Sequence, residues 1–174
     1  EFRRVLFRSV EWKQNLKNIG ELDAESVFSQ INHVCSKIAQ GAVRSALSGL
    51  RSNTKLQELV ASADVSDSTI AKAVSLYNYL LGVSSCLSYN LRDAKAQFEE
   101  SIKVAGNISQ PTEGVYFFPV EARTSLASVV LDADCNFAEA ESYYDSAIAE
   151  LKAANNNVLL AWVYVYRASM WVSK

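Results

Sequence analysis

The helical pattern of this chain is clearest in 70-IAKAVSLYNYLLGVSSCLSYNLRDAKAQFEESIKVAG-106. Apolar and small residues recur every three or four positions along each half of it, which is the period of a helix with one buried face. A polar break at Asn90 separates the halves, and Gly106 and Pro111 close the second one. The pattern predicts a hairpin of two helices, Ile70–Asn90 and Leu91–Ala105. Because such a hairpin cannot bury its apolar face alone, it predicts stacking on similar neighbours in a short α-solenoid.

The same spacing continues on both sides of this hairpin. Residues 119–133, beginning at Pro119, and residues 137–154 form a second predicted pair, since proline suits the first turn of a helix. Shorter amphipathic segments precede the hairpin, with a break near Gly41, and residues 158–172 form a last helix. We therefore expect an all-α chain of antiparallel helix pairs with seven to eight helices, and residues 10–174 as a single helical-repeat domain.

Small and large residues alternate where the paired helices should cross. An alanine lets two helix backbones approach to about 8–10 Å, and a large aromatic residue one turn later fills the space beside it. The spacing repeats after 46 residues, from Ala94 to Ala140. The expected packing residues are Tyr77, Leu81, Ala94, Phe98, Ala140, Tyr144 and Ala147.

Composition and charge restrict the classes of function. The 174 residues are 49% hydrophobic and 21% charged, which is typical of a globular domain, and no apolar run is long enough to predict a membrane span. The net charge of −2 argues against a general binder of nucleic acid backbones. Three widely spaced cysteines predict small buried residues of a reducing compartment instead of a disulfide framework.

Residues 1–9, EFRRVLFRS, match the in-frame translation of a common short-read sequencing adapter. The codons GAG TTC AGA CGT GTG CTC TTC CGA TCT encode them without a mismatch. We interpret this segment as a scar that is not native and exclude it from the fold; the alternative is a genuine basic segment at the end of a targeting peptide. Without these residues, 14 basic side chains stand against 18 acidic ones, and the net charge becomes −4.

The hairpins resemble two related repeat families. Leu81-Gly82 followed by Ala94 and Phe98 is similar to the tetratricopeptide repeat, and 140–147 matches the second helix of that pattern completely. Tyr77-Asn78-Tyr79-Leu80-Leu81, followed by Ala94, Phe98, Gly106 and Pro111, resembles the pentatricopeptide repeat over about 35 residues. Both resemblances imply stacked helix pairs.

The second resemblance raises RNA binding as an alternative function. Pentatricopeptide proteins read about one base per repeat through a few polar side chains. Asn78 falls in the region where that family keeps such residues, although a solvent-exposed or capping asparagine is the simpler interpretation. Because the repeats are few and irregular and the charge is negative, we expect no RNA binding.

We expect neither an enzyme nor a cofactor or metal. His33 is the only histidine, and His33 and Cys35 point to different faces of a predicted helix. No glycine-rich phosphate-binding loop is present. The acidic pairs Glu99-Glu100 and Glu139/Glu141 are interpreted as a solvated helix surface.

The last predicted helix is apolar on nearly every face. A helix of this kind is either buried or in contact with a partner, and tryptophan, tyrosine and methionine are enriched in protein interfaces. The alternatives are packing inside this domain or against a further C-terminal segment. The candidate partner-binding residues are Trp162, Tyr166, Met170 and Trp171.

These observations predict a non-enzymatic subunit that docks on other protein subunits of a larger complex. The pentatricopeptide resemblance implies a mitochondrial or, as an alternative, a plastid location. The size, helix number and degenerate repeats are similar to the helical-repeat accessory subunit on the catalytic head of euglenozoan mitochondrial ATP synthase. A general tetratricopeptide adaptor and an organellar RNA-binding fragment remain the alternatives.

Overall fold

The computed structural model describes residues 27–108 and 118–172, and the adapter-like residues 1–9 lie outside this part. Within it the chain forms eight α-helices and no strand. The all-α prediction is confirmed, and the hairpin bounds agree with it to within three residues. The helices are α3 (Val27–Ala39), α4 (Val43–Ser52), α5 (Thr54–Ala61), α6 (Ser68–Leu87), α7 (Leu91–Ala105), α8 (Phe118–Asp134), α9 (Phe137–Ala153) and α10 (Asn157–Val172).

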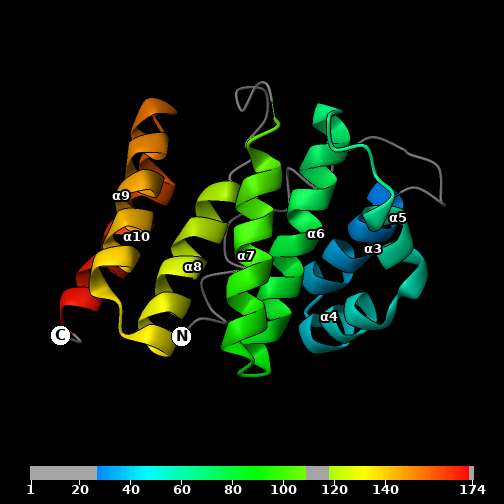
Figure 1. The fold of residues 1–174 in the computed structure, drawn as a ribbon, viewed down its shortest axis with the longest axis horizontal. Coiled ribbons are helices and arrows are strands. Elements are labelled where there is room, and N and C mark those ends of the chain that lie inside the picture. Colours follow the sequence, from blue (N-terminus) through cyan, green and yellow to red (C-terminus); the bar gives the residue numbers. More distant parts are fainter. Residues whose placement is uncertain (1–26, 109–117, 173–174) are drawn as a thin grey trace.

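The helices stack in chain order. Figure 1 shows α6, α7, α8 and α9 side by side, with the short helices α3–α5 at one end of the row and α10 beside α9 at the other. The most extensive contacts are between α6 and α7 and between α8 and α9, and α7 also packs on α8. The fold is therefore a short helical repeat built from antiparallel pairs, with α10 as the outermost helix of one end.

A glycine and a phenylalanine form the centre of the first pair. Phe98 on α7 is fully buried over Gly82 on α6, and its ring also lies 5.9 Å from the ring of Tyr79. A Cβ atom at position 82 would lie 2.5 Å from Cε1 of Phe98. The absence of a side chain at Gly82 is therefore what lets the two helices come this close.

The second pair repeats this contact 46 residues later with different chemistry. Ser128 on α8 takes the place of Gly82, and Tyr144 on α9 takes the place of Phe98. The hydroxyl groups of Ser128 and Tyr144 lie 3.2 Å apart, and Tyr144 is otherwise buried. The larger residue on α8 is thus matched by a hydrogen-bonding group on α9.

Two buried serines join the first pair further along its length. Ser101 Oγ donates to the carbonyl oxygen of Ser75 at 2.8 Å, and Ser75 Oγ donates to the carbonyl oxygen of Ser101 at 3.0 Å. Because both hydroxyls are hydrogen-bonded, the cost of removing them from water is offset. These two hydrogen bonds allow serine at the buried position 101.

Three turns between helices share one construction. A residue with a left-handed backbone follows the end of one helix. The next residue is an asparagine, and its side-chain oxygen accepts a hydrogen bond from the backbone N–H three residues later, as an N-cap does. These turns join α6 to α7, α8 to α9 and α9 to α10. The pairs are Tyr89 with Asn90, Cys135 with Asn136, and Asn155 with Asn156.

The fold corrects two expectations from the sequence. Asn78 is neither exposed nor a cap: it lies buried within α6, which removes it as a candidate for base recognition. Of the cysteines, Cys35 is buried, Cys86 is half-buried and Cys135 is exposed, because Cys135 occupies the turn after α8. Burial raises the pKa of the Cys35 thiol to about 12.

Candidate functional site

The outward face of α10 is the most unusual surface of the described chain. Val158 and Val165 are each 58% exposed and Val172 is 89% exposed, although all three are β-branched apolar residues. They are spaced seven residues apart, so they lie along one line of the helix. Ala161 and Ala168, also exposed and seven apart, lie between them.

This arrangement has the periodicity of a coiled-coil seam. Valine occupies every first position of a heptad and alanine every fourth, which is the spacing that makes one helix pack along another. Trp162, 43% exposed, lies beside the valine line. We call the five residues the α10 seam: Val158, Ala161, Val165, Ala168 and Val172.

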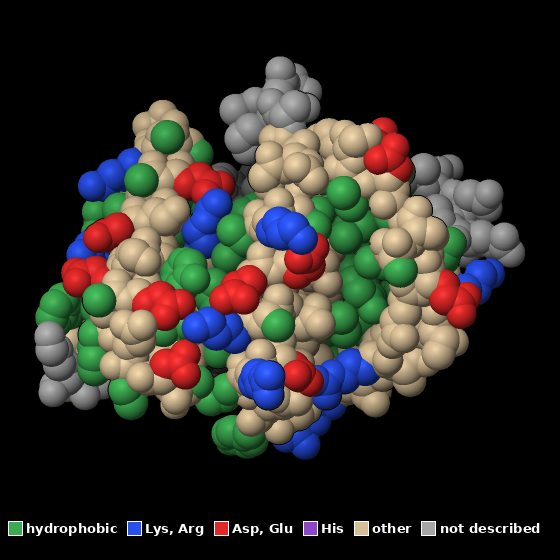
Figure 2. Space-filling model, in the orientation of Figure 1, with side chains coloured by type: hydrophobic (Ala, Val, Ile, Leu, Met, Phe, Trp, Pro, Cys, Tyr) green, Lys and Arg blue, Asp and Glu red, His purple; other side chains and the backbone are tan. Residues whose placement is uncertain are grey.

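No charge interrupts the seam. Arg167 is the only charged residue of α10, and it points away, toward α9. Its guanidinium donates to Glu141 at 2.8 Å and forms an ion pair with Asp145 at 2.9 Å. Figure 2 shows apolar side chains at the surface of this end of the molecule, next to the charged side chains of α9.

The opposite face of α10 holds the helix on the repeat. Val163 and Met170, seven residues apart, are buried in the main core, and Leu159, Leu160 and Tyr166 pack partly against it. Together with the Arg167 ion pairs, these contacts fix which side of α10 faces outward. The seam is therefore presented on a packed helix rather than on a free one.

The structure separates the four residues predicted to bind a partner. Trp162 and Trp171 are exposed, at 43% and 47%. Met170 is buried and Tyr166 is half-buried, so these two belong to the contact with the rest of the fold. The seam itself was missed, although the seven-residue recurrence of valine is visible in the sequence.

The structure places six of the seven repeat-packing residues in the core and leaves the seventh at its edge. Leu81 is half-buried and packs against the core from outside. The buried ones are Tyr77, Ala94, Phe98, Ala140, Tyr144 and Ala147.

A carboxyl oxygen is buried between α6 and α8. The Glu121 carboxyl on α8 lies against the hydroxyl of Tyr79 on α6, and its Oε2 is shielded from solvent. Burial raises the pKa of this carboxyl to about 7, and the Tyr79 hydroxyl lowers it by less. Burial raises the pKa of the Tyr79 hydroxyl, and the nearby charges of Glu121 and of Tyr166 on α10 raise it further. Glu121 corresponds to Ser75 of the first pair, 46 residues earlier.

The described side chains offer little for metal or membrane chemistry. No cluster of three or more His, Cys, Asp or Glu residues that could hold a metal ion occurs within the described ranges. The described helices are also all too short or too polar to cross a bilayer. His33 is exposed and Cys35 is buried on the same helix, so the two do not form a site.

Comparison of this chain with protein-family models, with curated proteins and with solved structures finds no match.

Proposed function

We propose that this protein is a non-enzymatic helical-repeat subunit that docks on a larger protein assembly through the α10 seam. The observation that carries the proposal is the exposed valine and alanine heptad on the outermost helix. A contiguous apolar strip that stays exposed on a packed helix marks an interaction site.

The geometry of the repeat favours an α-helix as the docking element. Helices α6 and α8 are each covered by the helix that follows them, α7 and α9 respectively. A partner helix on the seam would extend this succession by one member. Alanine at the fourth heptad position leaves room for a close approach of the two backbones.

A sharper form of the proposal places the assembly in the mitochondrion, on the catalytic head of an ATP synthase. Its support is the resemblance of the central hairpins to pentatricopeptide repeats, together with the size and helix number of the chain. A protein of this kind would act by positioning other subunits and would need no cofactor or small-molecule substrate.

The proposal is tested by placing a charge in the seam. Ala161→Glu puts a carboxylate within the apolar face, and Ala96→Glu makes the same change at an exposed position of α7. The tagged proteins are purified from the source organism and their partners are quantified. We expect the parent and Ala96→Glu to recover the same partners in fixed stoichiometry, and Ala161→Glu to lose them.

Thermal unfolding of the purified variants provides the control for folding. Both substitutions are at exposed positions, so both variants should unfold within a few degrees of the parent. Recovery of the parent as a free monomer would contradict docking altogether. Equal partner recovery by Ala161→Glu would show that the partners bind elsewhere.

A further inference from the structure

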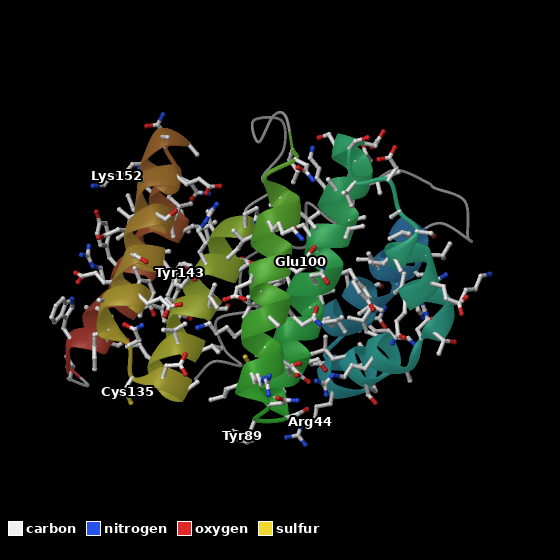
Figure 3. The ribbon with its side chains drawn as sticks, viewed as in Figure 1. Arg44, Tyr89, Glu100, Cys135, Tyr143 and Lys152 are labelled. Carbon is white, nitrogen blue, oxygen red and sulfur yellow. The ribbon has the colours of Figure 1, made fainter. Side chains whose placement is uncertain are left out.

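The end of the molecule at the α6–α7 turn carries a second unusual surface, distinct from the α10 seam. Tyr89, in the turn itself, is 91% exposed. Figure 3 shows Tyr89 and Arg44 at this same end of the molecule, with Lys152 at the opposite corner. Arg92 follows three residues after Tyr89 on α7.

Tyr89 is in a backbone conformation that does not suit tyrosine. Its φ is +56°, in the left-handed region where glycine and asparagine are favoured. The two other turns of this construction have smaller residues at this position, Cys135 and Asn155. Because the Tyr89 side chain is almost fully exposed, packing does not repay the strain. A strained, exposed aromatic residue indicates a function for its ring.

The positive charges of Arg44 and Arg92 are also at unfavourable positions in their helices. Each is the second residue of its helix, α4 and α7 respectively. The first turn of a helix carries partial positive charge and favours acidic side chains. Neither arginine therefore stabilises the helix in which it stands.

Arg51 completes the group from the other end of α4. It donates to Ser85 Oγ at 2.7 Å and to Ser88 Oγ at 3.3 Å, just before Tyr89. Among the described residues, neither it nor Arg44 or Arg92 makes an ion pair with a carboxylate, whereas Arg123 and Arg167 both do. The uncompensated guanidinium groups are thus concentrated at one end of an acidic protein.

We propose that this end, formed by Arg44, Arg51, Tyr89 and Arg92, binds an acidic segment of a protein partner. Arginine and tyrosine are the residue types that most often dominate binding energy in protein interfaces. Carboxylates of the segment would accept paired hydrogen bonds from the guanidinium groups, and its carbon chain would lie on the Tyr89 ring. A protein segment is favoured over RNA because single-stranded RNA stacks on several aromatic side chains along a basic groove, whereas this group of four residues contains one aromatic ring, that of Tyr89.

The test uses a fluorescein-labelled decapeptide of glutamate as the probe and a ten-nucleotide uridine RNA as its rival. Binding is followed by fluorescence anisotropy at low salt with the complete chain. The double variant Arg44→Gln/Arg92→Gln removes two charges from this end. The matched control, Lys103→Gln/Lys152→Gln, removes two positive charges from the last turns of α7 and α9, away from the α6–α7 turn.

We expect the glutamate peptide to bind, with its Kd raised at least about fivefold in the arginine variant and changed less than about twofold in the lysine variant. Binding should weaken at high salt. Absence of peptide binding, equal effects of the two variants, or tighter binding of the RNA would each overturn the proposal.

The melting temperature separates binding from a structural role. If Arg44 and Arg92 serve binding, their replacement leaves the melting temperature unchanged or raises it, because a cation leaves each helix N-terminus. A lower melting temperature of the arginine variant would assign these residues to the fold and overturn the proposal. Tyr89→Asn should weaken peptide binding while keeping the turn, and unchanged binding would count against the proposal.

Discussion

The same substitution, glycine to alanine, should have opposite effects at two helical positions of this protein. Gly82 on α6 lies directly under the Phe98 ring, whereas no atom lies within 4 Å of the position that a Cβ atom would take at Gly49 on α4. Both glycines stand inside helices. The comparison therefore isolates the contact between α6 and α7 from the intrinsic preference of the residue.

The structure sets the size of the two effects. Alanine in place of glycine inside a helix stabilises by roughly 0.5–1 kcal/mol, which is the whole effect expected at Gly49. At Gly82 the new methyl group would lie 2.5 and 2.6 Å from two ring carbons of a fully buried phenylalanine. Overpacking of this kind costs about 1–3 kcal/mol. After the helical gain is subtracted, Gly82→Ala should destabilise by about 1 kcal/mol.

Urea unfolding followed by circular dichroism measures both effects. Gly49→Ala should raise the free energy of unfolding and Gly82→Ala should lower it. A third variant, Gly82→Ala/Phe98→Leu, tests the cause: compared with Phe98→Leu alone, it should show a reduced or reversed penalty, since the ring is gone. If Gly82→Ala stabilises as much as Gly49→Ala, α6 and α7 are not in the close contact described.

Three further predictions concern buried and strained side chains. Burial raises the pKa of the Glu121 carboxyl from 4.5 to about 7. The folded chain therefore holds this proton more tightly than the unfolded chain does. As the pH rises between these two values, the free energy of unfolding should fall by up to ~3 kcal/mol. The advantage of Glu121→Gln over the parent in urea unfolding should therefore grow between about pH 5 and pH 8, and a constant difference would contradict the burial of the carboxyl. Phe98→Ala should cost about 3–5 kcal/mol in the same assay, because it leaves a cavity between α6 and α7; a loss below about 1 kcal/mol would refute this packing. Tyr89→Gly should raise the melting temperature through relief of about 1 kcal/mol of backbone strain, and a clear decrease would show that the tyrosine side chain stabilises the turn.

The central hairpin could be predicted because its signals are local. Asn90 caps α7 and Gly106 follows its end, so the predicted Leu91–Ala105 is the observed helix. The burial of Ala94 and Phe98 follows from the small-and-large alternation that two crossing helices require. Periodicity within one segment was sufficient for these features.

The orientation of α10 could not be predicted in the same way. Its sequence is apolar on nearly all faces, so periodicity alone does not say which face is buried. The ion pairs of Arg167 with Glu141 and Asp145 and the burial of Met170 decide it, and these are contacts with another helix. The left-handed conformation of Tyr89 was also hidden, because tyrosine carries no local signal for it.

The α10 seam is proposed to receive a helix of another protein. The most direct test is photo-crosslinking in the native assembly from a benzoylphenylalanine placed at Val165, in the middle of the seam, with a second probe at Ala96 on α7 as the control. We expect the probe at 165 to form adducts with a helical segment of one partner subunit and the probe at 96 to form none. Adducts from 165 only with a second copy of this chain, or none at all in the intact assembly, would contradict it.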